Sequence, residues 1–371
     1  MRSRILASLI FLIPVGLFAD ETHAPQTAEY CGDCHRAIYD GWKRSVHATA
    51  MESRLFQDAM KMAESEFSAD ARKVCLRCHS PLAASSGDLS LTRKVSWEGI
   101  TCDYCHSVQD VTPTKTNPIA QVMFNGVKSG PSSDAVSPMH GTRFSKVHTT
   151  SLVCSTCHQY RNSLGFEVLT TYAEWEKSPY AKAGQQCQSC HMYGVQGKIV
   201  DVRVTSNPAH GINLHQMPGS RSVEQLNRAI QSQISTTRQG DKVKVVVKLT
   251  NAGAGHYVPT GSPMRKLILE VRLDPFGAGE ALRAERVYAR TIRDQKGATV
   301  QREHIAFLRG AGAMEDTRIA PKETRTETFS FDLPEGRRAR VEANLYYFYS
   351  PMAVSEAEQK LRFITVSRLI Q

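Results

Sequence analysis

The sequence of 371 residues has no cysteine outside five short copies of one pattern, which excludes an ordinary disulfide scaffold. Its longest apolar run lies at the extreme N-terminus and is too short to span a bilayer comfortably. With 22% charged and 41% hydrophobic residues, it resembles neither an acidic disordered chain nor a polytopic membrane protein. Its length is sufficient for two or three domains with a buried core.

The N-terminal segment has the pattern of a secretory signal peptide. Two arginines precede about 14 apolar residues, from Ile5 to Phe18, and the small residue Ala19 ends the run. We therefore predict a signal peptide at residues 1–19 and export to an oxidising compartment, most simply a bacterial periplasm, with possible association with the outer surface. An uncleaved anchor is the alternative reading of the run, whereas a lipid anchor is not expected because no cysteine follows it.

All ten cysteines belong to the pattern C-x-x-C-H, which occurs five times. The five copies comprise Cys31, Cys34 and His35; Cys75, Cys78 and His79; Cys102, Cys105 and His106; Cys154, Cys157 and His158; and Cys187, Cys190 and His191. Two thiols at this spacing can form thioethers with the two vinyl groups of one haem, and the following histidine then lies under the iron as its proximal ligand. The pattern predicts five covalently attached haem c groups.

Zinc binding or disulfide formation is the competing explanation of paired cysteines. Histidine makes up 13 of 371 residues, so a histidine after every one of five pairs is not expected by chance. Five pairs would also leave one pair over in a four-cysteine zinc scheme. These two observations favour haem attachment.

The positive charge of the chain does not predict nucleic-acid binding. The formal net charge of +10 falls when Arg2 and Arg4 leave with the signal peptide. The two propionates of each haem would offset most of the remainder. We expect protein redox partners, namely a quinol-linked donor and a periplasmic or outer-surface acceptor, and at most a peripheral contact with the membrane.

Eight histidines lie outside the motifs, enough to give every haem iron a second, distal histidine. We predict six distal candidates, and regard His23 and His304 as weaker, with His304 in a strand-like, structural setting. The six candidates are His47, His140, His148, His210, His215 and His256. Two histidine ligands give low-potential haems suited to electron transfer, so we expect five low-spin haems.

A short repeated pattern leaves the sixth ligand of one haem iron open. Trp42 and His47 recur as Trp175 and Tyr180 in the form W-x-x-S-x-H/Y, with tyrosine at the ligand position. Either Tyr180 packs on a porphyrin whose sixth ligand comes from elsewhere, or one iron has an open or tyrosine-flanked face.

Several segments resemble the cytochrome c-554-like multihaem cytochromes, relatives of the haem-rich part of hydroxylamine oxidoreductase. The matching segments are YCGDCHRAIYDGWKRSVHATAM, WEGITCDYCHSV, GPSSDAVSPMHGTRFSKVHTTSLVCSTCHQY, YAEWEKSPYAKAGQQCQSCHM and GAGHYVPTGSPMRKLIL. The resemblance implies closely stacked haems in a mainly helical, loop-rich domain, with His47 and either His140 or His148 as distal ligands. The namesake of the family has four haems, whereas this chain has five motifs and an additional C-terminal domain.

The residue pattern divides the chain into parts. We predict a pentahaem cytochrome domain at residues 20–220, with a helical stretch at 37–60 and a long wrapping loop at 107–146. A helical connector is predicted at 221–239, because apolar residues share one helical face there. From residue 240 to 371, alternating apolar and polar residues predict an Ig-like β-sandwich, so the expected fold class is α+β.

Three functions fit these predictions. The first is an electron carrier of an anaerobic respiratory chain, passing single electrons along closely packed haems. The second is an oxidoreductase that acts on a small nitrogen or sulfur compound, such as nitrite, hydroxylamine or nitric oxide, at one open haem. The third is a polymerising cytochrome with the β domain as its assembly module. We favour the carrier because histidines are abundant and no motif histidine is replaced by lysine, as typically occurs in pentahaem nitrite reductases.

Overall fold

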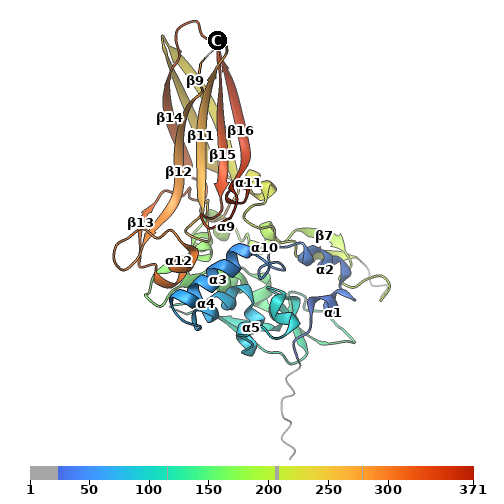
Figure 1. Cartoon of the computed structure of the whole chain (residues 1–371). Helices are drawn as coiled ribbons and strands as arrows, with labels where there is room; N and C mark the ends of the chain where they lie inside the picture. Colours follow the sequence, from blue (N-terminus) through green and yellow to red (C-terminus); the bar gives the residue numbers. More distant parts are fainter. Residues whose placement is uncertain (1–23, 115, 205–208, 278) are drawn as a thin grey trace, which may run out of the picture.

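The computed structural model describes residues 24–114, 116–204, 209–277 and 279–371. Short helices and small hairpins form one part of the molecule, and long strands form a second part that stands upon it (Figure 1). The chain ends at the far tip of the strands. The predicted signal peptide and His23 lie outside the described residues.

The N-terminal part is built from short elements. In chain order they are α1 (Ala28–Gly32), α2 (Arg36–Lys43), α3 (Arg54–Glu66), α4 (Ala71–His79), α5 (Pro81–Ser86), η1 (Lys94–Trp97), α6 (Cys102–Ser107), β1 (Val108–Thr112), β2 (Ile119–Val122), β3 (Val127–Gly130), β4 (Gly141–Phe144), η2 (Lys146–Thr149), α7 (Leu152–His158), β5 (Tyr160–Arg161), β6 (Glu167–Leu169), α8 (Thr171–Glu176), α9 (Pro179–Lys182), α10 (Cys187–His191), β7 (Gly194–Gly197), β8 (His210–Asn213) and α11 (Val223–Ala229). Helices this short are not stable on their own and depend on what they pack against.

Two predictions for this part are wrong in detail. The helical stretch predicted at 37–60 is interrupted, because α2 ends at Lys43 and α3 begins only at Arg54, with turns between them. Apolar periodicity did not reveal the break, since the turn residues themselves bury Ala48 and Met51. The predicted loop at 107–146 contains two strand pairs, antiparallel β1–β2 and parallel β3–β4.

The C-terminal part consists of two sheets. Its elements are β9 (Ile230–Gln239), β10 (Lys242–Asn251), β11 (Lys266–Pro275), β12 (Leu282–Arg293), α12 (Glu303–Arg309), β13 (Gly312–Asp316), β14 (Thr324–Asp332), β15 (Ala339–Phe348), α13 (Glu356–Gln359) and β16 (Lys360–Ile370). One sheet has the order β14-β10-β9 and the other β13-β12-β11-β15-β16, and every pairing is antiparallel. The predicted β-sandwich and α+β class are confirmed.

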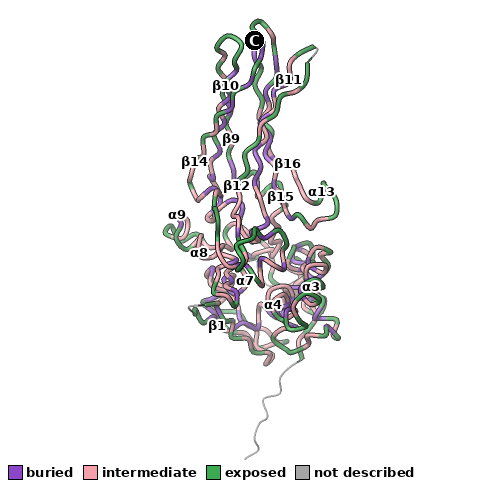
Figure 2. The backbone as a smooth tube through the Cα atoms, turned by 60° about the vertical axis from the view of Figure 1, so that its left-hand side comes forward, coloured by how far each residue is buried: buried purple, intermediate pink, exposed green. Residues whose placement is uncertain are grey.

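The sandwich core follows from period-two patterning. Val243, Val245, Val247 and Leu249 of β10 are fully buried, while the lysines between them are exposed. Buried and exposed segments alternate along the long strands in Figure 2. Because side chains of a strand point alternately to its two faces, each sheet directs one apolar face toward the other.

The predicted helical connector at 221–239 is only half correct. Helix α11 ends at Ala229, and the rest of the segment is β9, the first strand of the sandwich. Apolar residues at Ile230 and Ile234 fit a helical repeat, but they also lie two strand periods apart on the buried face of β9. His304, predicted in a strand-like run, lies instead in α12, where it is buried beside Glu66 at 3.2 Å.

Hydrophobic packing is unevenly distributed. One large apolar cluster fills the sandwich, whereas the described residues of the N-terminal part form small separate clusters, such as the one around Met51, Leu76 and Phe56. So little apolar packing does not by itself stabilise a domain of this length. We therefore expect the N-terminal part to depend on additional buried apolar material, which five porphyrins would provide.

Polar contacts fasten the sandwich to the N-terminal part. Asn162 Nδ2 donates to the Gly310 carbonyl at 2.7 Å, and Arg290 donates to the Glu167 carbonyl at 2.9 Å. The sandwich therefore contacts the N-terminal part through its lower loops and α12 (Figure 1). Within the described residues, none of the helices combines the length and hydrophobicity that a membrane crossing requires.

We predict that Leu269→Ala lowers the free energy of unfolding by about 2–5 kcal/mol, because it leaves a cavity in the sandwich core. Leu269 is fully buried in β11. Chemical denaturation measures the change, and Leu369→Ala on β16, where the side chain is 58% exposed, is the control that should change little. Equal losses in the two variants would contradict this description of the core.

Candidate functional site

Short helices present the C-x-x-C-H motifs. The second to fifth motifs lie within α4, α6, α7 and α10, and the first spans the end of α1 and the start of α2. At helical spacing, the two cysteines of a motif lie one turn apart on the same side, and the histidine follows directly. Thr101 Oγ1 caps α6 by accepting from the Tyr104 amide at 3.0 Å, which starts this helix at Cys102. All ten cysteines are free thiols.

Four motif histidines face a second histidine from a distant part of the chain. The distances between ring centroids are 6.3 Å for His35–His140, 6.3 Å for His47–His158, 6.2 Å for His106–His215 and 6.3 Å for His191–His256. The partners come from the loop before β4, the turn between α2 and α3, the segment after β8 and the loop between β10 and β11.

The spacing within these pairs fits one metal ion between two imidazoles. A metal–nitrogen bond of about 2 Å on each side, with about 1.1 Å from each nitrogen to its ring centre, separates two centroids by about 6.2 Å. The four observed separations agree with this value. The residues present therefore fit haem iron with two axial histidines.

The orientation of the rings is fixed by backbone carbonyls. In five of the eight paired histidines, Nδ1 lies within hydrogen-bond distance of a main-chain oxygen, which leaves Nε2 free to bind a metal. These contacts are His35 to Ile199 at 2.8 Å, His106 to Ser129 at 2.7 Å, His140 to Gly141 at 2.9 Å, His215 to Asn213 at 2.5 Å and His256 to Tyr257 at 2.9 Å. His215 also has a φ of +55°, an uncommon backbone conformation for a residue with a side chain.

Burial favours the neutral form of four of the paired histidines. Burial lowers the pKa of His47 to about 4, that of His106 to about 3 and that of His158 to about 3. Burial also lowers the pKa of His191 to about 4. Neutral imidazole is the form that binds a metal ion.

His148 also lies beside His106, with ring centroids 5.7 Å apart and nearly parallel planes. Its Nε2 is 2.9 Å from the Cys105 carbonyl, while its buried Nδ1 has no hydrogen-bond partner among the described residues. His215 and His148 are thus two different neighbours of one motif histidine, and only His215 keeps a free Nε2.

The second motif differs from the other four. Within the described residues, the ring stacked on His79 is that of Phe56, at a centroid distance of 3.8 Å and an interplanar angle of 9°. Sequence patterning gave no sign of this role, because Phe56 reads as an ordinary apolar residue of α3. Phe56 and His79 come together because α3 and α4 pack against each other.

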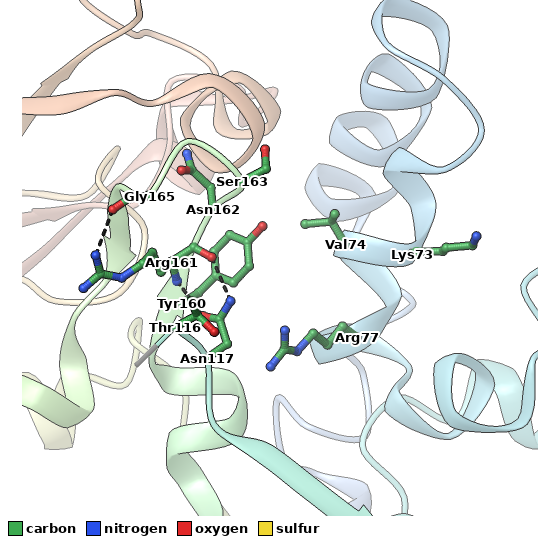
Figure 3. A pocket seen from close by; sticks show the side chains of 10 residues that line it. All are labelled: Lys73, Val74, Arg77, Thr116, Asn117, Tyr160, Arg161, Asn162, Ser163 and Gly165. Atoms are coloured by element: carbon green, nitrogen blue, oxygen red, sulfur yellow. Dashed lines mark hydrogen bonds between the residues drawn. The ribbon is translucent and has the colours of Figure 1, made fainter. Parts of the chain in front are cut away.

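A cavity of about 500 Å³ lies beside the second motif, between α4 and the β5–β6 hairpin. Arg77 and Val74 of α4 face Tyr160 across it, whereas Lys73 points away from it (Figure 3). Burial raises the pKa of Tyr160 to about 12, so its hydroxyl stays protonated at neutral pH.

The thiols connect the five motifs to one another. The Cys102 thiol lowers the pKa of Cys31, and the thiols of Cys157 and Cys187 raise those of Cys78 and Cys154, so motifs one and three, two and four, and four and five lie near one another. Burial and the nearby Cys157 thiol raise the pKa of Cys105, which places motif three near motif four. The five attachment sites therefore form one continuous group.

Two further residues singled out in the sequence are His210 and Tyr180. The side chain of His210 lies outside the described residues, although its backbone is part of β8. Tyr180 uses its hydroxyl to donate to the Ala252 carbonyl and to accept from Lys322. Tyr180 therefore fastens the N-terminal part to the sandwich.

Comparisons with known proteins were made on the whole chain. Residues 30–107 match the family model of cytochrome c554 and c-prime. The structure superposes on a penta-heme cytochrome c552 from Thermochromatium tepidum with a TM-score of 0.70 and 23% identity, covering 93% of this chain and 99% of that one. A search of curated proteins found no significant match.

Two further structures align with 38% of this chain. They are the hypothetical protein PH1083 from Pyrococcus horikoshii OT3, at 11% identity over 90% of that chain, and a superoxide reductase, at 12% identity over 86% of that chain. Their TM-scores of 0.20 are too low to indicate a shared fold. Residues 30–107 are therefore similar to cytochrome c554 and c-prime, and the chain as a whole shares the fold of the penta-heme cytochrome c552.

Proposed function

We propose that this protein is a periplasmic electron carrier with five covalent haem c groups. The observation that carries the proposal is the set of four histidine pairs whose rings are 6.2–6.3 Å apart. Bound haem would supply one-electron redox chemistry, and two axial histidines hold an iron nearly unchanged between its oxidation states. The protein contributes rigid ligands and exclusion of water.

In this proposal the motif residues attach the haems and provide their proximal ligands. The thioether cysteines are Cys31 and Cys34, Cys75 and Cys78, Cys102 and Cys105, Cys154 and Cys157, and Cys187 and Cys190, and the proximal ligands are His35, His79, His106, His158 and His191. The distal ligands we assign are His140, His47, His215 and His256. We place His148 outside the ligand set, because its Nε2 faces the Cys105 carbonyl.

The contacts between motifs support transfer through the whole domain. Thiols of different motifs are near enough to shift one another's pKa, so groups attached to them would lie close together. Carbonyl-anchored imidazoles such as His35 and His106 cannot swing away when the charge of the site changes. Both features favour a carrier that passes single electrons with little structural change.

Export supports the periplasmic assignment. We assign residues 1–19 as a signal peptide, and free thiols in an oxidising compartment require the protection that thioether bonds would give them. Its partners would be redox proteins, a quinol-linked donor and a periplasmic or outer-surface acceptor of an anaerobic respiratory chain. The direction of flow depends on their potentials.

A second candidate function is reduction or oxidation of a small nitrogen or sulfur compound at the second motif. The observation that favours it is that, within the described residues, His79 is the motif histidine with no histidine ring facing it, and Phe56 packs on the face of its imidazole at 3.8 Å. The adjacent cavity carries Arg77 and the protonated hydroxyl of Tyr160, which suit a small anionic or polar substrate. The same protein can serve both functions, since one open haem does not interrupt the group of five.

The two neighbours of His106 give the first test. We expect His215→Ala to convert one haem per chain from low-spin to high-spin, because it removes the ring with a free Nε2. EPR of the oxidised protein measures this change. The matched control is His148→Ala, which should keep the wild-type spin state. The reverse result would make His148 the ligand.

The wild-type protein provides the second test. In place of the five low-spin haems that the histidine count predicts, we expect EPR to show four low-spin haems and one high-spin haem, and cyanide to bind one haem per chain, because within the described residues no histidine ring faces His79. Five low-spin haems with no cyanide binding would exclude the second candidate function and leave the electron carrier.

A further inference from the structure

The loop between β10 and β11 brings a side chain of the sandwich into the N-terminal part. It carries His256, which faces His191 of α10 at a centroid distance of 6.3 Å. A loop is the least constrained kind of element, so a ligand on it needs local contacts that fix its position. Asn251 and a backbone bridge between Val258 and Ile319 hold the loop to the sandwich, and one residue of α8 holds it to the N-terminal part.

Glu174 lies in α8 with its side chain 7% exposed. Its Oε2 accepts hydrogen bonds from the Tyr257 amide at 3.1 Å and from the Thr260 hydroxyl at 2.8 Å. Tyr257 directly follows His256 in the chain, and Thr260 lies three residues after Tyr257. The carboxylate thus holds the loop at two points on the C-terminal side of the histidine.

The other oxygen of Glu174 fixes the carboxylate itself. Oε1 accepts from the Thr170 hydroxyl at 2.6 Å and from Arg318 Nη1 at 2.7 Å, and Arg318 also pairs with Asp316 at 2.8 Å. Arg318 is as buried as Glu174, with 7% of its side chain exposed. A buried carboxylate with four donors has no freedom to turn.

The loop also lies directly against α8 and α9. A Cβ built on Gly255 would be 3.1 Å from Trp175 and 3.2 Å from Tyr180, so this close approach requires a residue without a side chain. The loop is therefore restrained twice. Gly255 packs against Trp175 and Tyr180, and Tyr257 and Thr260 are hydrogen-bonded to Glu174.

We propose that Glu174 is a positioning residue that holds the His256 loop on the N-terminal part, so that the imidazole stays directed toward His191. This inference rests on the proposed function, in which His256 is a distal ligand. Glu174 ties this loop of the sandwich to α8 of the N-terminal part. Removal of the carboxylate should therefore make the His256 side chain more mobile, although His256 itself is unchanged.

The test compares four variants of the full-length holoprotein. Glu174→Ala removes all four acceptor contacts. Thr260→Val removes one donor to Glu174, together with the contact between the Thr260 and Thr171 hydroxyls, and leaves the pair with Arg318 intact. His256→Ala removes the assigned ligand. Glu176→Ala, at an exposed position of the same helix, is the matched control.

Two readouts are measured on each variant: the high-spin EPR signal of the oxidised protein and hydrogen exchange of the amides at 255–261. We expect Glu174→Ala to speed exchange in this loop roughly tenfold or more, because a buried hydrogen-bond network is lost. It should also produce a high-spin signal of up to one additional haem per chain, which added imidazole returns to low-spin. Thr260→Val should give the same changes to a smaller extent, and Glu176→Ala neither.

The outcomes separate this inference from the proposal on which it rests. A wild-type spectrum for His256→Ala would show that His256 is not a ligand, which contradicts the ligand assignment. If His256→Ala gives a new high-spin haem while Glu174→Ala and Thr260→Val keep wild-type spectra and exchange, the positioning role of Glu174 is overturned. If Glu174→Ala does not fold, Thr260→Val decides the same question.

Discussion

The distance between two facing imidazole rings is the constraint on which the N-terminal part depends. Its helices are short and its apolar clusters small, so the fold has few other means of fixing segments far apart in the chain. Four ring pairs at one common separation join the first segments of the domain to its last ones. Metal coordination and folding are coupled in such an arrangement, because the ligands come together only in the folded chain.

The β-sandwich has the opposite character. It has an extensive apolar core and antiparallel strands. Its loop that carries His256 is held against α8 by Glu174. In the ligand set that we propose, the sandwich thus supplies the imidazole that faces His191.

The sequence was sufficient for features with local causes and insufficient for those with distant causes. The C-x-x-C-H motifs and the alternation along β10 each follow from neighbouring residues, and both were predictable. The pairing of His47 with His158 depends on how the whole domain folds, which no local pattern encodes. For the same reason Phe56 could not be distinguished from a core residue, and the boundary between α11 and β9 was missed because Ile230 and Ile234 fit both periods.

The central claim is that each of the four imidazole pairs encloses an iron. The most direct measurement is the anomalous diffraction of crystals of the exported holoprotein, collected at the iron absorption edge. The account predicts five iron peaks, four of which lie midway between the rings of His35 and His140, His47 and His158, His106 and His215, and His191 and His256. Peaks displaced from these midpoints, or no iron at the motifs, would contradict it.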